Sequence, residues 1–118
     1  MTDSLLVQLR KGVLDMCVLA MLAQRDGYAY DIASRLAQDI GMGEGTIYPL
    51  MRRMQADGLV KTYLEESSSG PPRKYYQLTR AGHAALAAQR AEWNSFVASV
   101  ARVLDANPSS ATAAGGAR

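Results

Sequence analysis

Residues 43–82 read GEGTIYPLMRRMQADGLVKTYLEESSSGPPRKYYQLTRAG, a stretch in which several kinds of pattern follow one another. Its first part, residues 44–57, has apolar side chains at steps of three and four, which predicts an amphipathic helix. Pro49 falls within the first turn or so of this helix, where a missing backbone N–H can be tolerated. Gly58 supplies a C-terminal stop, so we expect the helix to end there.

A hairpin and another helix are predicted next. Residues 59–65 and 74–78 are strand-like, and the Glu, Ser, Gly and Pro residues at 66–72 predict an irregular hairpin tip between them. Thr79 is a good N-cap for a long helix over residues 79–105. A helix followed by a hairpin with basic flanks is typical of a winged helix-turn-helix, which places one helix in the DNA major groove and the hairpin beside it.

The residues before this stretch predict two more helices, over 4–24 and 29–40, with a short glycine-rich turn at 41–43. We therefore predict a mainly α fold with a small β-hairpin wing, that is, a winged helix-turn-helix plus one long C-terminal dimerisation helix. The predicted parts are a DNA-binding domain at 1–78, a dimerisation helix at 79–105 and a disordered tail at 106–118.

The positive charge of the chain is concentrated in the predicted DNA-reading segment. The 118 residues hold 13 Lys and Arg against 11 Asp and Glu, a formal net charge of +2. Residues 42–80 hold six basic and four acidic residues, and the rest of the chain holds seven of each. The whole excess therefore falls where DNA contact is predicted, although two charges are a small margin.

Side chains on the outer face of the third helix are the first candidates for DNA contact. Thr46 and Tyr48 can donate to phosphates or reach base edges, and the following arginine pair can contact phosphate or guanine. The alternative is a solvated helix face, which an isolated arginine pair would more often be. Two cations at the start of the second strand can neutralise phosphates beside the wing. The alternative is an ordinary exposed hairpin with two solubilising charges. The residues predicted from these patterns are Gly45, Thr46, Tyr48, Arg52, Arg53, Arg73 and Lys74.

The fourth helix carries an apolar seam of coiled-coil type, which needs a partner. Its members follow at steps of four and three: Leu86, Arg90, Trp93, Val97, Val100 and Leu104, broadened by Phe96 and Val103. The first helix is unusually apolar, so we expect a two-fold homodimer in which the fourth helix of one chain packs on the first helix of the other. Such a dimer predicts a pseudo-palindromic operator. The predicted interface residues are Leu9, Val13, Leu86, Trp93, Phe96, Val97 and Val100.

Trp93 allows two interpretations. It can be an anchor of the dimer interface, a common role for tryptophan. It can also stack on a flat aromatic ligand between the subunits, in which case Trp93, Phe96 and Leu9 border the effector site.

Several classes of function are disfavoured. No apolar run approaches the ~20 residues needed to span a bilayer, and the N-terminus lacks the pattern of a signal peptide. The chain has a single cysteine, Cys17, which fits a reducing cytoplasm. Because Cys17 falls on the apolar face of the first helix, we expect a buried thiol rather than a redox switch. The chain has one histidine and neither a P-loop nor a dinucleotide motif. We therefore expect that it is not an enzyme and that it has no catalytic residues, metal or cofactor. Its expected location is the cytoplasm.

The segments GTIYPLMRRMQADGLV and PPRKYYQLTRAG, together with GYAYDIA at 27–33, resemble the PadR family of bacterial transcriptional regulators. The similarity extends from residue 4 to about 105 and fits the subgroup with one C-terminal helix. The resemblance implies a homodimeric winged-helix repressor whose affinity for double-stranded DNA is often modulated by a small aromatic or drug-like compound. By this similarity the operator contacts are Thr46, Tyr48, Arg52, Ser68, Arg73 and Lys74. The alternative is a dimeric module that binds a ligand or partner on the same scaffold but no operator.

Overall fold

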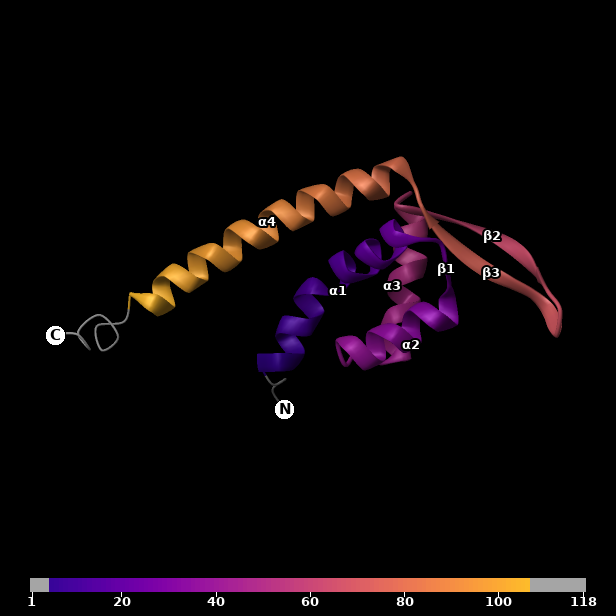
Figure 1. The fold of residues 1–118 in the computed structure, drawn as a ribbon, viewed down its shortest axis with the longest axis horizontal. Helices are drawn as coiled ribbons and strands as arrows, with labels where there is room; N and C mark the ends of the chain where they lie inside the picture. The colour runs from indigo at the N-terminus through magenta and orange to yellow at the C-terminus, as the bar shows by residue number, and fades with distance from the viewer. Residues whose placement is uncertain (1–4, 107–118) are drawn as a thin grey trace. The chain divides into compact units, whose positions relative to one another are not determined.

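The computed structural model describes residues 5–106, apart from the side chains of Val7 and Glu44, and within them four helices and three strands (Figure 1). The elements are α1 (Leu5–Gln24), β1 (Gly27–Tyr28), α2 (Ala29–Asp39), α3 (Glu44–Ala56), β2 (Val60–Ser67), β3 (Gly70–Leu78) and α4 (Arg80–Asp105). The chain divides into two compact units, Met1–Leu86 and Ala87–Arg118. The predicted disordered tail, apart from Ala106, lies outside the described residues.

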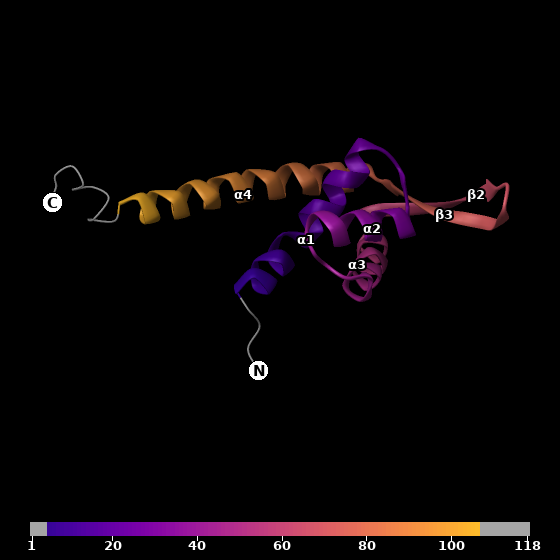
Figure 2. The same cartoon turned by 60° about the horizontal axis from the view of Figure 1, so that its bottom comes forward.

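The predicted fold class is confirmed, with one strand that sequence patterns missed. Gly27 and Tyr28 form β1, which pairs antiparallel with β3 at Tyr76 and Tyr75. The sheet order is β1-β3-β2, so β3 is the middle strand near the helices. Figures 1 and 2 both show the β2–β3 hairpin extending away from α1, α2 and α3.

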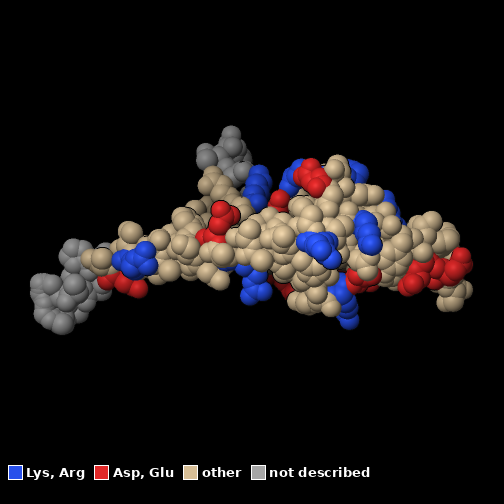
Figure 3. All heavy atoms as spheres, turned by 90° about the horizontal axis from the view of Figure 1, so that it is seen from above, with Lys and Arg blue, Asp and Glu red and all other residues tan. Residues whose placement is uncertain are grey.

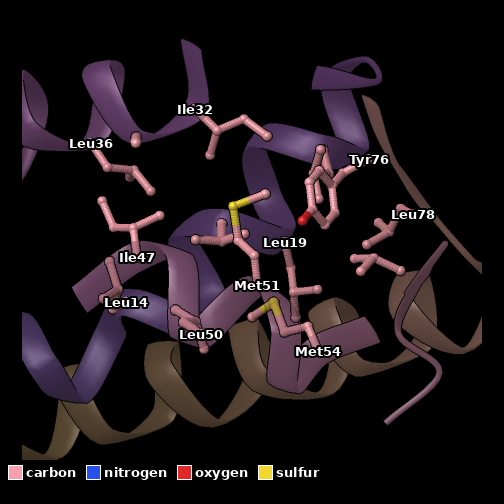
Figure 4. Packing of buried hydrophobic residues seen from close by; sticks show 14 of the residues in the cluster. Leu14, Leu19, Ile32, Leu36, Ile47, Leu50, Met51, Met54, Tyr76 and Leu78 are labelled. Atoms are coloured by element: carbon pink, nitrogen blue, oxygen red, sulfur yellow. The ribbon is translucent and has the colours of Figure 1, made fainter. Parts of the chain in front are cut away.

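The core of the first unit is made where one face of each helix meets the sheet (Figure 4). Most buried residues recur at helical spacing in α1, α2 and α3, and Tyr76 and Leu78 alternate with less buried residues in β3. Val60 of β2, Met42 of the α2–α3 turn and Leu86 of α4 complete the core. The buried set is Leu14, Val18, Leu19, Leu22, Ile32, Ala33, Leu36, Met42, Ile47, Leu50, Met51, Met54, Val60, Tyr76, Leu78 and Leu86.

Two glycines end the helices of the helix-turn-helix. Gly41 follows α2 with a φ of 83°, and its backbone N–H lies within hydrogen-bonding distance of the Leu36 and Ala37 carbonyls. Gly58 follows α3 with a φ of 78°, after which the Leu59 N–H donates to the carbonyl of Met54. Both positions lie in the left-handed region that favours glycine, so the direction in which the chain leaves each helix is set by sequence.

The hairpin is more regular than its composition indicates, and the prediction of an irregular tip over 66–72 is wrong. β2 continues to Ser67 and β3 begins at Gly70. Between the pairs Glu65–Arg73 and Ser67–Gly70 the register shifts, so Pro71 and Pro72 occupy a bulge opposite a single residue. A bulge suits proline, which cannot donate to a ladder, and β1 does not reach this part of β3.

The start of α4 is fixed to the α3–β2 connection. The Gly82 N–H donates to the Thr79 hydroxyl oxygen at 3.0 Å, which confirms the predicted N-cap. The same hydroxyl lies 2.7 Å from the carbonyl oxygen of Gly58. A Cβ on Gly82 would overlap the carbonyl oxygen of Leu59, so a side chain does not fit at this crossing.

The second unit, in its described part, is the remainder of α4. Its large apolar side chains are exposed: Trp93, Phe96, Val97, Val100, Val103 and Leu104. Over residues 5–106, no helix is long and apolar enough to cross a membrane.

Candidate nucleic-acid interface

One long face of α3 is open to solvent. Ile47, Leu50, Met51 and Met54 are buried, which turns the opposite side of the helix outward. Tyr48 differs from the rest of the predicted set because it is half-buried and packs against the core. The exposed residues of α3 are Gly45, Thr46, Pro49, Arg52, Arg53, Gln55 and Ala56.

Arg52 lies near the centre of this open face. Helical spacing places Gly45, Pro49 and Ala56 along the same line, so small or compact side chains surround the arginine. Within residues 5–106, Arg52 has neither an ion pair nor a hydrogen-bond partner. Its guanidinium therefore retains all five donors for a ligand.

Arg53 points to one side of the same helix. Its Nη2 atom lies 2.7 Å from Oδ2 of Asp15 on α1. Thr46, Arg53 and Asp15, together with Lys11, Leu14, Pro49 and Leu50, line a shallow groove between α1 and α3. Sequence analysis missed Asp15, because 38 positions separate it from Arg53 and no local pattern joins them.

On the other side, α3 is tied to the wing. The Gln55 side chain donates to the Thr62 hydroxyl at 3.4 Å. Cross-strand pairs place Thr62, Leu64, Lys74 and Tyr76 on one face of the hairpin. Lys74 is therefore on the hairpin face that is linked to α3.

Arg73 occupies the opposite face of β3, because successive side chains of a strand alternate. Its guanidinium lies 4.9 Å from the ring centroid of Tyr28. The Tyr75 ring is 5.9 Å from that of Tyr28 and is stacked on that of Tyr63 at 5.7 Å. Arg73 therefore lies on an aromatic side of the wing, with Tyr28, Tyr63 and Tyr75. Lys74 lies on the α3 side, where its Nζ atom is 5.7 Å from the ring centroid of Tyr76.

Asp26 joins this aromatic side to the end of α1. Its Oδ2 atom accepts hydrogen bonds from the Tyr63 hydroxyl at 2.7 Å and from the Gln77 amide at 3.2 Å. The bond to the carboxylate, with smaller contributions from burial and nearby charges, raises the pKa of Tyr63 to about 12. Tyr63 is therefore a neutral donor at physiological pH, and Asp26 holds the sheet against the α1–β1 connection.

The wing is acidic near its tip. Figure 3 shows Asp and Glu side chains gathered at the hairpin end, where the sequence has Glu65 and Glu66. Ser68, the predicted wing contact, lies exposed in the two-residue turn beyond them. Near the tip, Glu65 and Glu66 balance Arg73 and Lys74, and Lys61 at the base of β2 leaves the whole hairpin with a single excess positive charge. This limits how far the tip can favour phosphate.

The residues of the predicted dimer interface fall into two groups. Leu9 is 56% exposed and Val13 is half-buried on α1, while Trp93 is 41% and Phe96 62% exposed on α4. Leu86 is instead 7% exposed and packs in the core of the first unit, so we leave it out of the seam.

Other potentially reactive groups form no site in the described chain. Cys17 is half-buried, and burial raises the pKa of its thiol, which favours the unreactive protonated form. Within residues 5–106, no cluster of three His, Cys, Asp or Glu side chains could hold a metal ion.

The family model and the solved structures that resemble this chain point to the same protein family. Residues 18–88 match the model of the transcriptional regulator PadR-like family. A PadR-like transcriptional regulator from Bacillus cereus is 36% identical, with a TM-score of 0.75 over 82% of this chain and 96% of the other. A PadR family transcriptional regulator from Eggerthella lenta is 35% identical, with a TM-score of 0.77 over 86% of this chain and 89% of the other.

A more distant structure is that of Bacillus subtilis PadR in complex with operator DNA. It is 23% identical, with a TM-score of 0.59 over 65% of this chain and 46% of the other. At this identity, the similarity is one of fold.

Proposed function

Because the chain belongs to the PadR-like family of transcriptional regulators, we propose that it is a dimeric repressor that binds a pseudo-palindromic operator through α3 and the wing. The family consists of regulators and not of enzymes. The proposed site of action is the cytoplasm, where a bacterial operator is found.

The observation that carries the proposal is the unpaired guanidinium of Arg52 on the open face of α3. A helix that enters the major groove reads base edges with such outward side chains, and an arginine can bond to two acceptors of one guanine. A good bidentate contact discriminates against a wrong base by about 1–3 kcal/mol. Thr46 and Lys74 are the proposed phosphate contacts on either side of it.

Dimerisation is supported by the exposed apolar side chains of α4 and α1. Val97 and Val100 continue the stripe begun by Trp93, and Leu9 is exposed on α1. Removing exposed apolar side chains such as these from water stabilises the assembly that buries them. A second copy of the chain carries the matching surfaces, so a two-fold dimer covers both helices at once.

The proposed effector is a small aromatic compound that stacks on Trp93 within the dimer. Trp93 is the only tryptophan of the chain, so its fluorescence reports this one position. A panel of flat aromatic compounds is expected to contain members that quench Trp93 and weaken operator binding over the same concentration range. If none of the panel changes either signal, an aromatic effector is excluded for that class of compound.

The test of operator binding is fluorescence anisotropy with labelled duplexes selected from genomic fragments, titrated with salt and with random competitor DNA. We expect tight binding that survives competitor and weakens steeply with salt. Arg52→Glu should reduce operator affinity at least tenfold. Arg102→Glu, which makes the same charge change in the last turn of α4, should reduce it much less.

Binding by the natural protein that is no tighter to the selected duplexes than to random DNA would contradict the proposal. It would favour the alternative, a dimeric winged-helix module that binds a ligand or a partner protein. In that case Arg52→Glu should leave the binding of that ligand or partner protein intact.

A further inference from the structure

The ion pair between Asp15 and Arg53 joins two elements that have different places in the proposed assembly. Asp15 lies on α1, and Arg53 lies on the reading helix α3. The two side chains approach to 2.7 Å while remaining 45% and 57% exposed, respectively. The pair therefore lies at an edge of the α3 face where DNA can reach it.

This contact occupies a small part of the hydrogen-bonding capacity of Arg53. A guanidinium has five N–H donors in a fixed plane, and the contact joins a single nitrogen, Nη2, to the carboxylate. The other donors stay available, but the plane in which they lie is held by α1. Thr46 and Pro49 line the same groove, so the held guanidinium is next to the first turns of the reading helix.

We propose that Asp15 is a positioning residue that makes Arg53 selective. Without this partner, Arg53, which lies at the edge of the α3 face and not near its centre as Arg52 does, can swing to any nearby phosphate and so strengthens binding to all sequences equally. Held by Asp15, Arg53 contacts DNA only where a phosphate or base edge meets it in that position. Asp15 thus lowers affinity for random DNA more than affinity for the operator. The inference rests on the proposed operator binding.

The chain offers a matched control for the charge of Asp15. Asp39 pairs with Arg35 at 3.9 Å on α2, and both of these side chains are exposed. Asp15→Asn and Asp39→Asn change the net charge equally, and each releases an arginine. The second substitution leaves Arg53 and the groove between α1 and α3 unchanged.

The experiment measures the dissociation constants of the natural protein and both variants for the selected operator duplex and for a random duplex of equal length. Asp15→Asn should tighten binding to the random duplex roughly two- to fivefold, the range expected from an exposed ion pair. Operator binding should tighten less, so the ratio of the two constants falls. Asp39→Asn should leave that ratio as it is.

A double-mutant cycle with Arg53→Gln separates positioning from simple loss of repulsion. If Asp15 acts through Arg53, the effect of Asp15→Asn disappears in the Arg53→Gln background. Asp15→Glu retains the carboxylate and should restore most of the discrimination. A thermal unfolding curve for each variant verifies that the first unit is folded.

The possible failures are distinguishable. A natural protein that binds both duplexes equally contradicts operator binding, and the role of Asp15 fails with it. A natural protein that discriminates, but whose discrimination is unchanged by Asp15→Asn, contradicts the role of Asp15 alone. An effect of Asp15→Asn that persists without Arg53 also contradicts it, since the charge would then act on DNA directly.

Discussion

The guanidinium carbon of Arg73 lies 4.9 Å from the ring centroid of Tyr28, which joins β3 to β1 by a cation–π contact. The neighbouring Lys74 lies on the opposite face of β3, together with Thr62 and therefore on the side linked to α3. The two adjacent cations of the wing thus have different surroundings. A DNA duplex bound along α3 would meet Lys74 before Arg73.

Lys74→Ala is expected to weaken binding to operator and random DNA by the same factor. Because one phosphate contact is lost, the slope of log affinity against log salt should become shallower by about one unit. Arg73→Ala should change that slope less. Each variant loses a cation–π contact, with Tyr28 or with Tyr76, that contributes about 0.5–1 kcal/mol, so both should lower the midpoint of thermal unfolding slightly. Equal loss of slope in both variants would contradict the division of the wing into two sides.

Val97→Asp is expected to convert the proposed dimer largely to monomer, since it places a charge within the apolar stripe of α4. Ala98→Asp adds the same charge on the next residue, outside the stripe, and should leave the assembly unchanged. Sedimentation velocity at several protein concentrations measures the oligomeric state of both variants and of the natural chain. A natural chain that sediments as a monomer at every concentration would rule out the dimer.

Gly82→Ala should destabilise the first unit severely, because the added Cβ overlaps the carbonyl oxygen of Leu59, a backbone atom held by the Thr79 contacts. We expect a loss of more than about 2 kcal/mol in the free energy of unfolding. Gly45→Ala is the comparison, since open space surrounds that position in α3 and alanine favours a helix. Urea unfolding of the two variants measures the difference, and similar midpoints would show that the crossing at Gly82 relaxes easily.

The hydrogen bond from Tyr63 to Asp26 should make stability depend on pH in the alkaline range. The pKa of Tyr63 is about 12 in the folded chain, against about 10 for an unperturbed tyrosine. The contribution of this bond to the free energy of unfolding is therefore complete below about pH 10 and is lost as the pH rises through about 12. Titration of the tyrosine ring carbons by NMR should show one late group, which moves to lower pH in Asp26→Asn.

The helices were predictable because each shows a regular apolar period that ends at a capping residue. Gly58 and Thr79 perform the roles that local sequence assigns to them. The wing was less predictable, since Ser and Pro near its tip look like loop residues and the ladder nevertheless extends to Ser67 and Gly70. A two-residue strand such as β1 leaves no alternation to detect.

For the candidate site, the sequence predicted which residues of α3 are exposed, apart from Tyr48, but not what they contact. An exposed face of α3 follows from the period of its buried stripe, so the position of Arg52 could be expected. The partner of Arg53 depends on how α1 packs against α3, which no local pattern records. Leu86 shares the period of the α4 seam, and periodicity alone does not reveal that it is covered within its own chain.

The uncovered apolar stripe of α4 has a consequence for gene dosage. If the dimer is the form that binds DNA and monomers predominate at cellular concentration, the amount of dimer grows with the square of the amount of chain. Halving the expression of the protein would then reduce operator-competent molecules about fourfold. A regulator of this kind responds to its own abundance more steeply than one that binds as a single chain.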